Sequence, residues 1–259
     1  MKKFIPCRTC PRKDNITPLG YYYSEKNGYQ ILIECDCHKK WRKEKDFEVS
    51  CEISSINKNY SFDFYLGDKS KTHLMCLMNF ALNFKNFVDK KVMIYLYGPN
   101  GTQKTSMAMA AGKEIIKQGY KVQYILMNNL ITTIIENTGP FNNEEEPKSF
   151  ALYERCKECD LLIIDESFDK SKVTLYKSGY QIPFLDSFLR ERLEVNNKNT
   201  MFISNTYPSQ IAGAGYEKSL QDLVERNTKS TFLEFYDNYA ECNVKSLSPE
   251  SFFGVNNGR

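Results

Sequence analysis

Between residues 67 and 243 the chain alternates stretches with a helical spacing of apolar residues and short, almost continuous apolar runs. The helical spacing predicts helices over 71–88, 104–119, 128–137, 149–158 and 183–195. The apolar runs, rich in β-branched and aromatic residues, predict buried strands over 91–98, 120–127, 159–167, 199–207 and 231–236. Because strands and helices alternate, we expect an α/β fold in which helices cover both faces of a parallel five-stranded sheet.

The first 50 residues follow a different pattern. They contain few apolar residues and many Cys, Tyr and Lys residues, so they predict a small module that needs help to fold. Within it, residues 19–34 predict a β-hairpin around the sequence EKNG. We therefore divide the chain into a cysteine-rich module (1–50), a linker (51–66), the α/β domain (67–243) and a polar C-terminal tail (244–259).

A phosphate-binding loop is predicted where the first strand of this domain meets its next helix. The sequence GPNGTQKT (98–105) matches the pattern G-x-x-x-x-G-K-[ST] at all fixed positions except Gln103. Lys104 supplies a cation for phosphate oxygens, and Thr105 supplies a hydroxyl ligand for Mg²⁺. The whole expected cofactor-binding stretch is Gly98, Pro99, Asn100, Gly101, Thr102, Gln103, Lys104, Thr105 and Ser106.

Gln103 raises the question whether this loop has kept its shape. A glycine at this position permits a positive φ, which costs another residue about 1 to 3 kcal/mol when the backbone is strained. A chance glycine-rich turn is the alternative interpretation. The order strand, loop, helix favours a true phosphate site, since the helix starting at Lys104 directs its positive dipole end at the phosphates.

Polar side chains follow two later strands. The apolar run LLIIDE ends in Asp165 and Glu166, and the run MFISN ends in Asn205. The carboxyl ends of parallel strands meet at the edge where ligands bind. Asp165 is therefore expected to share Mg²⁺ with Thr105, Glu166 to orient and deprotonate a water, and Asn205 to contact the γ-phosphate or that water. A strand capped by solvated carboxylates, or an Asn that only forms a turn, remains the alternative.

The phosphate loop is followed along the chain by the acid pair and then by the polar strand end. In this order of motifs the chain resembles the AAA+ ATPases. YGPNGTQKT, LLIIDES and MFISNTYP are most similar to DnaC/DnaI-type helicase loaders of bacteria and phages, and to the related IstB-type transposition ATPases. The resemblance covers roughly residues 60–240. It implies self-association, with an arginine of one subunit completing the neighbour's ATP site. The segment SLQDLVERN (219–227) resembles the one that carries it, so Arg226 is the candidate, with an ordinary exposed helix arginine as the alternative.

Cysteine spacing predicts a metal site in the N-terminal module. Cys7 and Cys10 form a CxxC pair, and Cys35 and Cys37 form a CxC pair. Four thiolates can hold a tetrahedral Zn²⁺, with His38 as a substitute fourth ligand, and free thiols are the alternative interpretation. The family resemblance implies that this module binds a DnaB-type hexameric helicase.

Composition adds less. A net charge of +3 over 259 residues is too small to identify a nucleic-acid partner. The basic runs 38–47 and 167–180 are each interpreted as solvated loops. The sequence start lacks a secretory signal and no apolar run reaches bilayer length, so we expect a cytoplasmic protein without membrane contact, in the host cytoplasm if the gene is phage-borne.

Three hypotheses for function follow. The first is an ATP-dependent helicase loader whose slow ATPase is stimulated by single-stranded DNA. DNA contacts are then expected from the helix 128–137 and from the loop 168–178, where Tyr176 and Lys177 suit base stacking and phosphate contact, although a solvated loop is the simpler interpretation. The second is an IstB-like regulator of DNA transposition. The third is an interaction protein that binds nucleotide with little hydrolysis, which Gln103 favours.

Overall fold

The structure is a computed structural model that describes residues 4–6, 10, 14–17, 20–50, 61–68, 71–138, 149–169 and 182–236. Its strands are β1 (Tyr21–Lys26), β2 (Tyr29–Glu34), β3 (Met93–Tyr97), β4 (Val122–Leu126), β5 (Leu161–Asp165), β6 (Asn199–Ser204) and β7 (Phe232–Glu234). Its α-helices are α1 (Asp36–Ser50), α2 (Thr72–Leu82), α3 (Lys104–Lys117), α4 (Met127–Thr138), α5 (Phe150–Glu158), α7 (Ile182–Arg190) and α8 (Lys218–Thr228). Shorter helical turns are η2 (Phe62–Phe64), η3 (Phe84–Asn86), η5 (Glu191–Val195), η6 (Pro208–Gln210) and η7 (Ala212–Ala214).

Strands β3 to β7 form the parallel five-stranded sheet that the sequence predicts, and the structure sets their order as β4-β5-β6-β3-β7. The strand that precedes the phosphate loop, β3, pairs with both β6 and β7 and so lies inside the sheet. Strands β4 and β5 pair in a register that sets Leu126 beside Asp165 at their carboxyl ends. The side chains expected to bind nucleotide therefore meet at one edge of the sheet.

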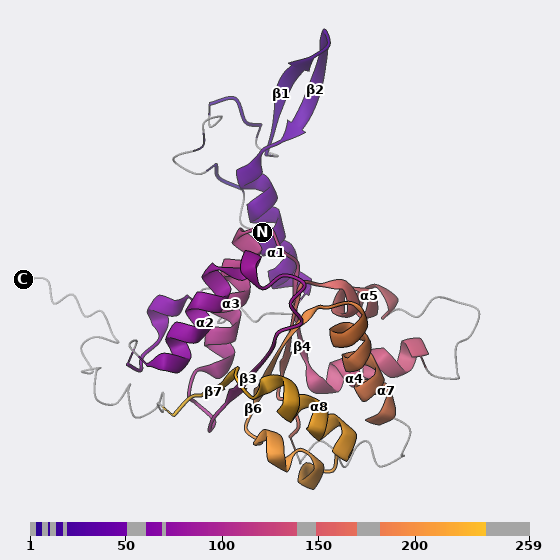
Figure 1. Cartoon of the computed structure of the whole chain (residues 1–259). Coiled ribbons are helices and arrows are strands. Elements are labelled where there is room, and N and C mark those ends of the chain that lie inside the picture. Colours follow the sequence, from indigo (N-terminus) through magenta and orange to yellow (C-terminus); the bar gives the residue numbers. More distant parts are fainter. Residues whose placement is uncertain are drawn as a thin grey trace, which may run out of the picture.

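Helices cover both faces of this sheet (Figure 1). Helices α2 and α3 pack on one face, and α4, α5, α7 and α8 pack on the other. Side chains along β5 point alternately to the two faces. Leu161 and Ile163 pack in the core beside α2 and α3, and Leu162 and Ile164 pack in the core on the opposite face. All four side chains are completely buried, so β5 is apolar on both faces.

The predicted helices are confirmed in place, and the largest difference lies at the end of the first. The prediction over 71–88 becomes α2, which ends at Leu82, followed by the separate turn η3. Asn83 leaves helical geometry with φ −110° and ψ 28°. Its backbone N–H and its side-chain amide both donate to the carbonyl oxygen of Asn79, at 3.1 and 3.2 Å, so Asn83 is the C-cap of α2.

The N-terminal residues form a hairpin on a helical neck. Strands β1 and β2 pair antiparallel around Asn27 and Gly28, whose φ values of 55° and 78° are those that a two-residue hairpin turn requires. The predicted hairpin is therefore confirmed. Figure 1 shows this hairpin projecting from the α/β domain on α1.

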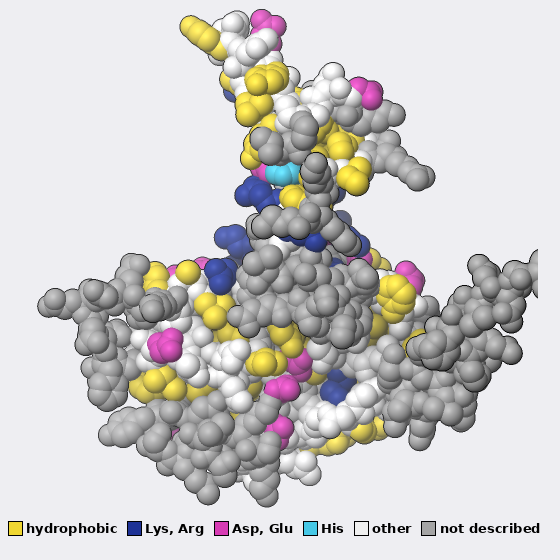
Figure 2. Space-filling model, turned by 180° about the vertical axis from the view of Figure 1, so that it is seen from behind, with side chains coloured by type: hydrophobic (Ala, Val, Ile, Leu, Met, Phe, Trp, Pro, Cys, Tyr) yellow, Lys and Arg dark blue, Asp and Glu magenta, His cyan; other side chains and the backbone are white. Residues whose placement is uncertain are grey.

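One prediction is wrong at the neck. The basic run 38–47 is part of α1, not a loop, because 36–50 contains neither Gly nor Pro and Asp36 provides a negative charge in the first turn. Lys39, Lys40 and Lys43 are exposed on it, and Figure 2 shows Lys and Arg gathered at this neck. Most of the second basic run, including Tyr176 and Lys177, lies outside the described residues.

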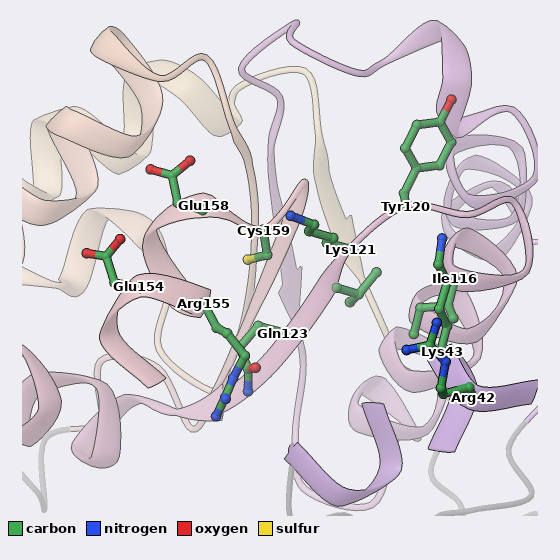
Figure 3. A pocket seen from close by; sticks show the side chains of 11 residues that line it. Arg42, Lys43, Ile116, Tyr120, Lys121, Gln123, Glu154, Arg155, Glu158 and Cys159 are labelled. Atoms are coloured by element: carbon green, nitrogen blue, oxygen red, sulfur yellow. The ribbon is translucent and has the colours of Figure 1, made fainter. Parts of the chain in front are cut away.

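Helix α1 meets the α/β domain at the amino end of the sheet. The Lys43 Nζ donates to the carbonyl oxygen of Gly119, just beyond α3, at 2.7 Å. A cleft of about 480 Å³ lies beside this contact. Figure 3 shows Arg42, Lys43 and Ile116 together on one side of it. Its lining residues are Arg42, Lys43, Ile116, Tyr120, Lys121, Val122, Gln123, Glu154, Arg155, Glu158 and Cys159.

The proposed domain boundaries stay predictions. Residues 51–60 of the expected linker and the whole tail at 244–259 lie outside the described residues. Among the helices that the structure describes, none combines the length and the apolar character needed to cross a membrane.

Candidate nucleotide-binding site

The loop after β3 has the geometry of a phosphate cradle. Gly98 must be a glycine, since a Cβ there would lie 2.1 Å from the carbonyl oxygen of Phe235. Gly101 and Gln103 both have left-handed backbone, with φ of 81° and 64°. Helix α3 begins at the next residue, Lys104, so its free N–H groups point into the loop. The loop has kept its turn although Gln103 replaces a glycine.

Lys104 is held inside this loop. Its side chain is only 7% exposed, and Nζ donates to the carbonyl oxygens of Gly98 and Pro99, each at 2.7 Å. Burial lowers the pKa of Lys104 to about 8, and the nearby Asp165 carboxylate opposes that shift. An ammonium whose charge is this costly to bury gains most from phosphate oxygens, which can replace neutral carbonyls as its partners.

This pKa leads to a prediction about protons. Bound phosphates favour the charged form of Lys104, so the pKa near 8 in the free protein rises on binding. We expect nucleotide binding to take up a proton at about pH 8.5 and much less at about pH 7, with affinity falling as the pH rises above 8. Calorimetry in two buffers of different ionisation enthalpy measures this uptake. Equal uptake at both pH values would contradict the assignment.

Asp165 lies at the centre of the site and is 6% exposed. One carboxylate oxygen accepts hydrogen bonds from the hydroxyls of Thr105 and Tyr124, both at 2.9 Å, and the other accepts the N–H of Glu166 at 2.7 Å. Burial raises the pKa of Asp165, and these three donors oppose the shift. Thr105 and Asp165 are thus adjacent, as predicted. Tyr124 was not predicted, because nothing in the sequence of β4 sets it apart from other strand tyrosines.

A cavity of about 470 Å³ opens between the phosphate loop and the ends of β5 and β6. Glu166 lines it and is exposed, with a left-handed φ of 52° that turns the chain at the strand end. The Asn205 side-chain amide also lines it and donates to the Asn100 side chain at 2.7 Å. Its described lining is Asn100 to Ser106, Asp165, Glu166, Ser167, Asp169, Ile203, Ser204 and Asn205.

Arg226 is not brought to this cavity. It lies on α8 with a side chain 66% exposed, and its guanidinium approaches Glu194 at 3.4 Å. The cavity lining given above does not include it. The structure therefore places Arg226 on the outer surface, outside the described lining of its own chain's cavity.

The oxygen ligands fit a magnesium ion. Mg²⁺ is bound through one or two carboxylates, hydroxyls and substrate phosphates. The adjacent Thr105 hydroxyl and Asp165 carboxylate supply two such oxygens at the mouth of the loop. These two residues would hold the ion together with the nucleotide.

A second candidate centre lies in the N-terminal module. The sulfurs of Cys10, Cys35 and Cys37 lie within 4.8 Å of one another, at 3.1 to 3.6 Å in pairs. These distances are far longer than a disulfide bond, and they approach the roughly 3.8 Å edge of a tetrahedral zinc–thiolate site. Burial raises the pKa of Cys35, but hydrogen bonds from Cys37 and Cys10 lower it overall. Cys7, the fourth expected ligand, lies outside the described residues.

His38 has a different role from the substitute ligand considered above. Its Nδ1 is 2.7 Å from the Glu34 carboxylate, and its ring stacks on Trp41. It also covers Gly20, where a Cβ would lie 2.1 Å from the imidazole. Within the described residues the close metal-ligand group contains the three thiols and not His38. The imidazole instead joins α1 to the hairpin.

The site can now be compared with known proteins. The sequence profile of the family described as IstB-like ATP binding protein matches residues 23–170, more than half of the chain. The chain belongs to the IstB-like ATP-binding family. This IstB-like protein is 25% identical over 203 residues to the chromosomal replication initiator protein DnaA of Campylobacter jejuni subsp. jejuni serotype O:23/36 (strain 81-176). The match covers 75% of the IstB-like chain and 43% of that DnaA, less than half of the relative's length.

Solved structures share the fold of the IstB-like protein. DnaI superposes with a TM-score of 0.55 at 16% identity, covering 76% of this chain and 99% of DnaI. The DnaC helicase loader gives 0.54 at 18% identity, covering 70% and 99%. DnaA bound to AMPPCP and single-stranded DNA gives 0.55 at 19% identity, covering 74% and 55%. The IstB-like protein therefore belongs to an ATP-binding family and shares its fold with DnaI and DnaC, and the five-stranded parallel sheet predicted from its sequence is confirmed.

Proposed function

We propose that this AAA+ protein is an ATP-dependent loader that places a DnaB-type replicative helicase on single-stranded DNA. The observation that carries the proposal is the thiol-bearing module, which projects on α1 from an AAA+ core of the DnaC and DnaI fold. The module is joined to the core at the opposite end of the sheet from the nucleotide cavity. A helicase held by the module would therefore leave the ATP site open to neighbouring subunits.

Hydrolysis would proceed at the cavity described above. The N–H groups of the loop and the Lys104 ammonium would bind the phosphates, with Asn205 contacting the γ-phosphate or the water. Glu166 would take a proton from the water as its oxygen bonds to the γ-phosphorus and the bond to ADP breaks. The magnesium ion held by Thr105 and Asp165 would neutralise charge that develops on the phosphate oxygens. The same residue roles suit a protein that hydrolyses ATP slowly and uses each hydrolysis to time a conformational change.

A neighbouring subunit would complete the site. Within the described part of the chain, Arg226 on α8 pairs with Glu194, and both side chains are exposed, so little energy is needed to free the arginine. In a self-assembled ring or filament it would reach the γ-phosphate of the adjacent chain and stabilise charge in the transition state. The proposed ATPase therefore depends on protein concentration.

A DNA-bound structure of similar fold gives the same proposal less direct support. The nucleotide-bound DnaA of similar fold was solved with single-stranded DNA. Of our two candidate DNA-contacting segments, 128–137 lies in α4, whereas the loop 168–178 lies largely outside the described residues. We propose that single-stranded DNA stimulates the slow ATPase through such segments.

We propose that a zinc ion is bound by the sulfurs of Cys7, Cys10, Cys35 and Cys37. We expect the purified chain to carry one zinc ion per protomer, and Cys35→Ser to lose it, because a site with three thiolates holds the metal far more weakly. Elemental analysis by mass spectrometry measures the ratio. Cys156→Ser is the matched control, since Cys156 is a buried thiol remote from the cluster. Wild-type zinc content in Cys35→Ser would contradict this site.

Capture of the host's DnaB-type helicase tests the proposed function. The full chain is immobilised and mixed with purified helicase, with and without ATP. We expect retention of the helicase by the wild type and loss of retention for Cys35→Ser, while nucleotide binding persists. No retention in any nucleotide state would rule out a loader for that helicase.

Transposition remains the second candidate, because the matching family is described by its IstB-like members. An IstB-like regulator would coat DNA and recruit a transposase. Retention of a transposase but not of the helicase in the same experiment would favour this function.

A further inference from the structure

Gln103 occupies a backbone conformation that favours glycine. Its φ of 64° and ψ of 17° are left-handed, at the residue that immediately precedes α3. A side chain in this region crowds the following carbonyl group, so the conformation is maintained only when neighbouring contacts outweigh its cost. The contacts of Gln103 therefore explain how the loop keeps its shape.

The Gln103 side chain makes two such contacts, both with the main chain of the segment 61–68. Its Oε1 accepts the N–H of Leu66 at 2.8 Å, and its Nε2 donates to the carbonyl oxygen of Phe64 at 3.1 Å. One donor and one acceptor fix which way the amide faces. Only an amide of this length provides both groups, so the pairing is specific to glutamine at this position.

The segment that receives these bonds is itself anchored. Phe62 and Tyr65 are 9% and 3% exposed in the core beside α2 and α3. The Tyr65 hydroxyl lies 3.1 Å from His73 Nε2, and its ring packs on Phe235, whose carbonyl oxygen contacts Gly98. The amide of Gln103 therefore attaches the phosphate loop to a surface segment that Phe62 and Tyr65 anchor in the core.

We propose that Gln103 is a positioning residue for the bound nucleotide: its amide replaces the conformational freedom of the usual glycine and holds the loop N–H groups ready for phosphate. This inference rests on the proposed ATP site. It predicts that the glutamine departs from the glycine pattern without loss of nucleotide binding. It also links the loop to the stretch of chain that leads from the N-terminal module into the core.

Two substitutions separate the amide from the backbone. Gln103→Met keeps the length of the side chain and removes both hydrogen bonds, so the left-handed turn loses its support. We expect the dissociation constant of a fluorescent ATP analogue to rise about tenfold. Gln103→Gly loses the same bonds but adopts the turn freely, and should stay within about threefold of the wild type. A Gln103→Gly protein as weak as Gln103→Met would overturn the proposed replacement of glycine.

Gln118→Met is the matched control at the other end of α3. The Gln118 amide also donates to a main-chain carbonyl, that of Ala81 at 2.6 Å, but lies outside the nucleotide cavity. We expect Gln118→Met to bind the analogue like the wild type. A purely structural role for Gln103 would lower the melting temperature of both variants and leave both affinities unchanged, and that outcome would overturn the proposal.

A change in the partner segment completes the test. Leu66→Pro removes the N–H that Gln103 accepts, and the preceding Tyr65 has a ψ of 122° that suits a following proline. We expect Leu66→Pro to weaken binding about threefold in the wild type and to add nothing in Gln103→Met, because the bond is then already absent. If the effects of Leu66→Pro and Gln103→Met on the dissociation constant were additive, the proposed coupling of Gln103 to Leu66 would be wrong. Unchanged nucleotide binding by Lys104→Ala would instead contradict the proposed ATP site. Failure of that site can therefore be told apart from failure of the role proposed for Gln103.

Discussion

Changing Lys104 to alanine is expected to weaken the binding of a fluorescent ATP analogue by about 100-fold. Lys104 is the one cation in the described lining of the cavity, which also contains the carboxylates of Asp165, Glu166 and Asp169. Without it, a triphosphate would face three negative side chains with only N–H groups and a metal ion to offset them. Titration of the analogue with and without magnesium measures the loss.

Folding cannot explain this loss. Alanine is the best helix former, and its introduction removes an ammonium that is costly to bury at 7% exposure. These gains offset the loss of the hydrogen bonds from Nζ to the Gly98 and Pro99 carbonyls, so we expect Lys104→Ala to melt close to the wild type. Lys117→Ala, on the same helix but in an exposed ion pair with Glu114, is the control and should bind normally. Binding within threefold of wild type by Lys104→Ala would refute the site.

Changing Arg192 to leucine is expected to lower the free energy of unfolding by about 4 kcal/mol. The Arg192 side chain is completely buried in η5, and the oxygens that accept its hydrogen bonds within the described residues are all uncharged. Its acceptors are the carbonyls of Cys156, Lys157, Cys159 and Asn199, at 2.7 to 2.9 Å, and the hydroxyl of Thr200, at 3.2 Å. Leucine would fill part of the space but remove five hydrogen bonds to these buried oxygens.

Two of these acceptors explain why the effect is large. The carbonyls of Cys156 and Lys157 lie in the last turn of α5, where no further helix N–H reaches them. Arg192 thus ends α5 and holds it to the start of β6. Urea denaturation measures the change, with Arg190→Leu as the control. Arg190 is 36% exposed and bonded to Asp186, so its loss should cost under about 1 kcal/mol. Equal effects of the two substitutions would contradict this role.

The sequence predicts most of the α/β domain because its signals are local. Each buried strand is a short apolar run, and β5, with four fully buried residues in succession, has no competing interpretation. The helix α1 was missed because its apolar residues do not form a continuous stripe and its charges suggest solvent. The absence of Gly and Pro from 36–50 was the available signal. The lack of these helix-breaking residues predicts a helix only if it is given more weight than the polar composition of the run.

The site divides in the same way. Lys104 and Thr105 belong to one contiguous motif, and Asp165 ends a recognisable strand, so sequence brings them together. Tyr124 reaches Asp165 across 41 residues of sequence, and Gln103 reaches Leu66 across 37. Neither pairing has a spacing that one sequence reveals. The first depends on the register of β4 against β5, and the second on where the segment 61–68 lies relative to the phosphate loop.

Helix α3 has a consequence for how distant parts of the molecule communicate. Its amino end begins at the phosphate loop, and the chain just past its carboxyl end, at Gly119, accepts the hydrogen bond from Lys43 on α1. Its 14 residues span about 21 Å as one stiff rod. A tilt of α3 about the triphosphate would act as a lever, and the hairpin at the far end of α1 would sweep through the longest arc.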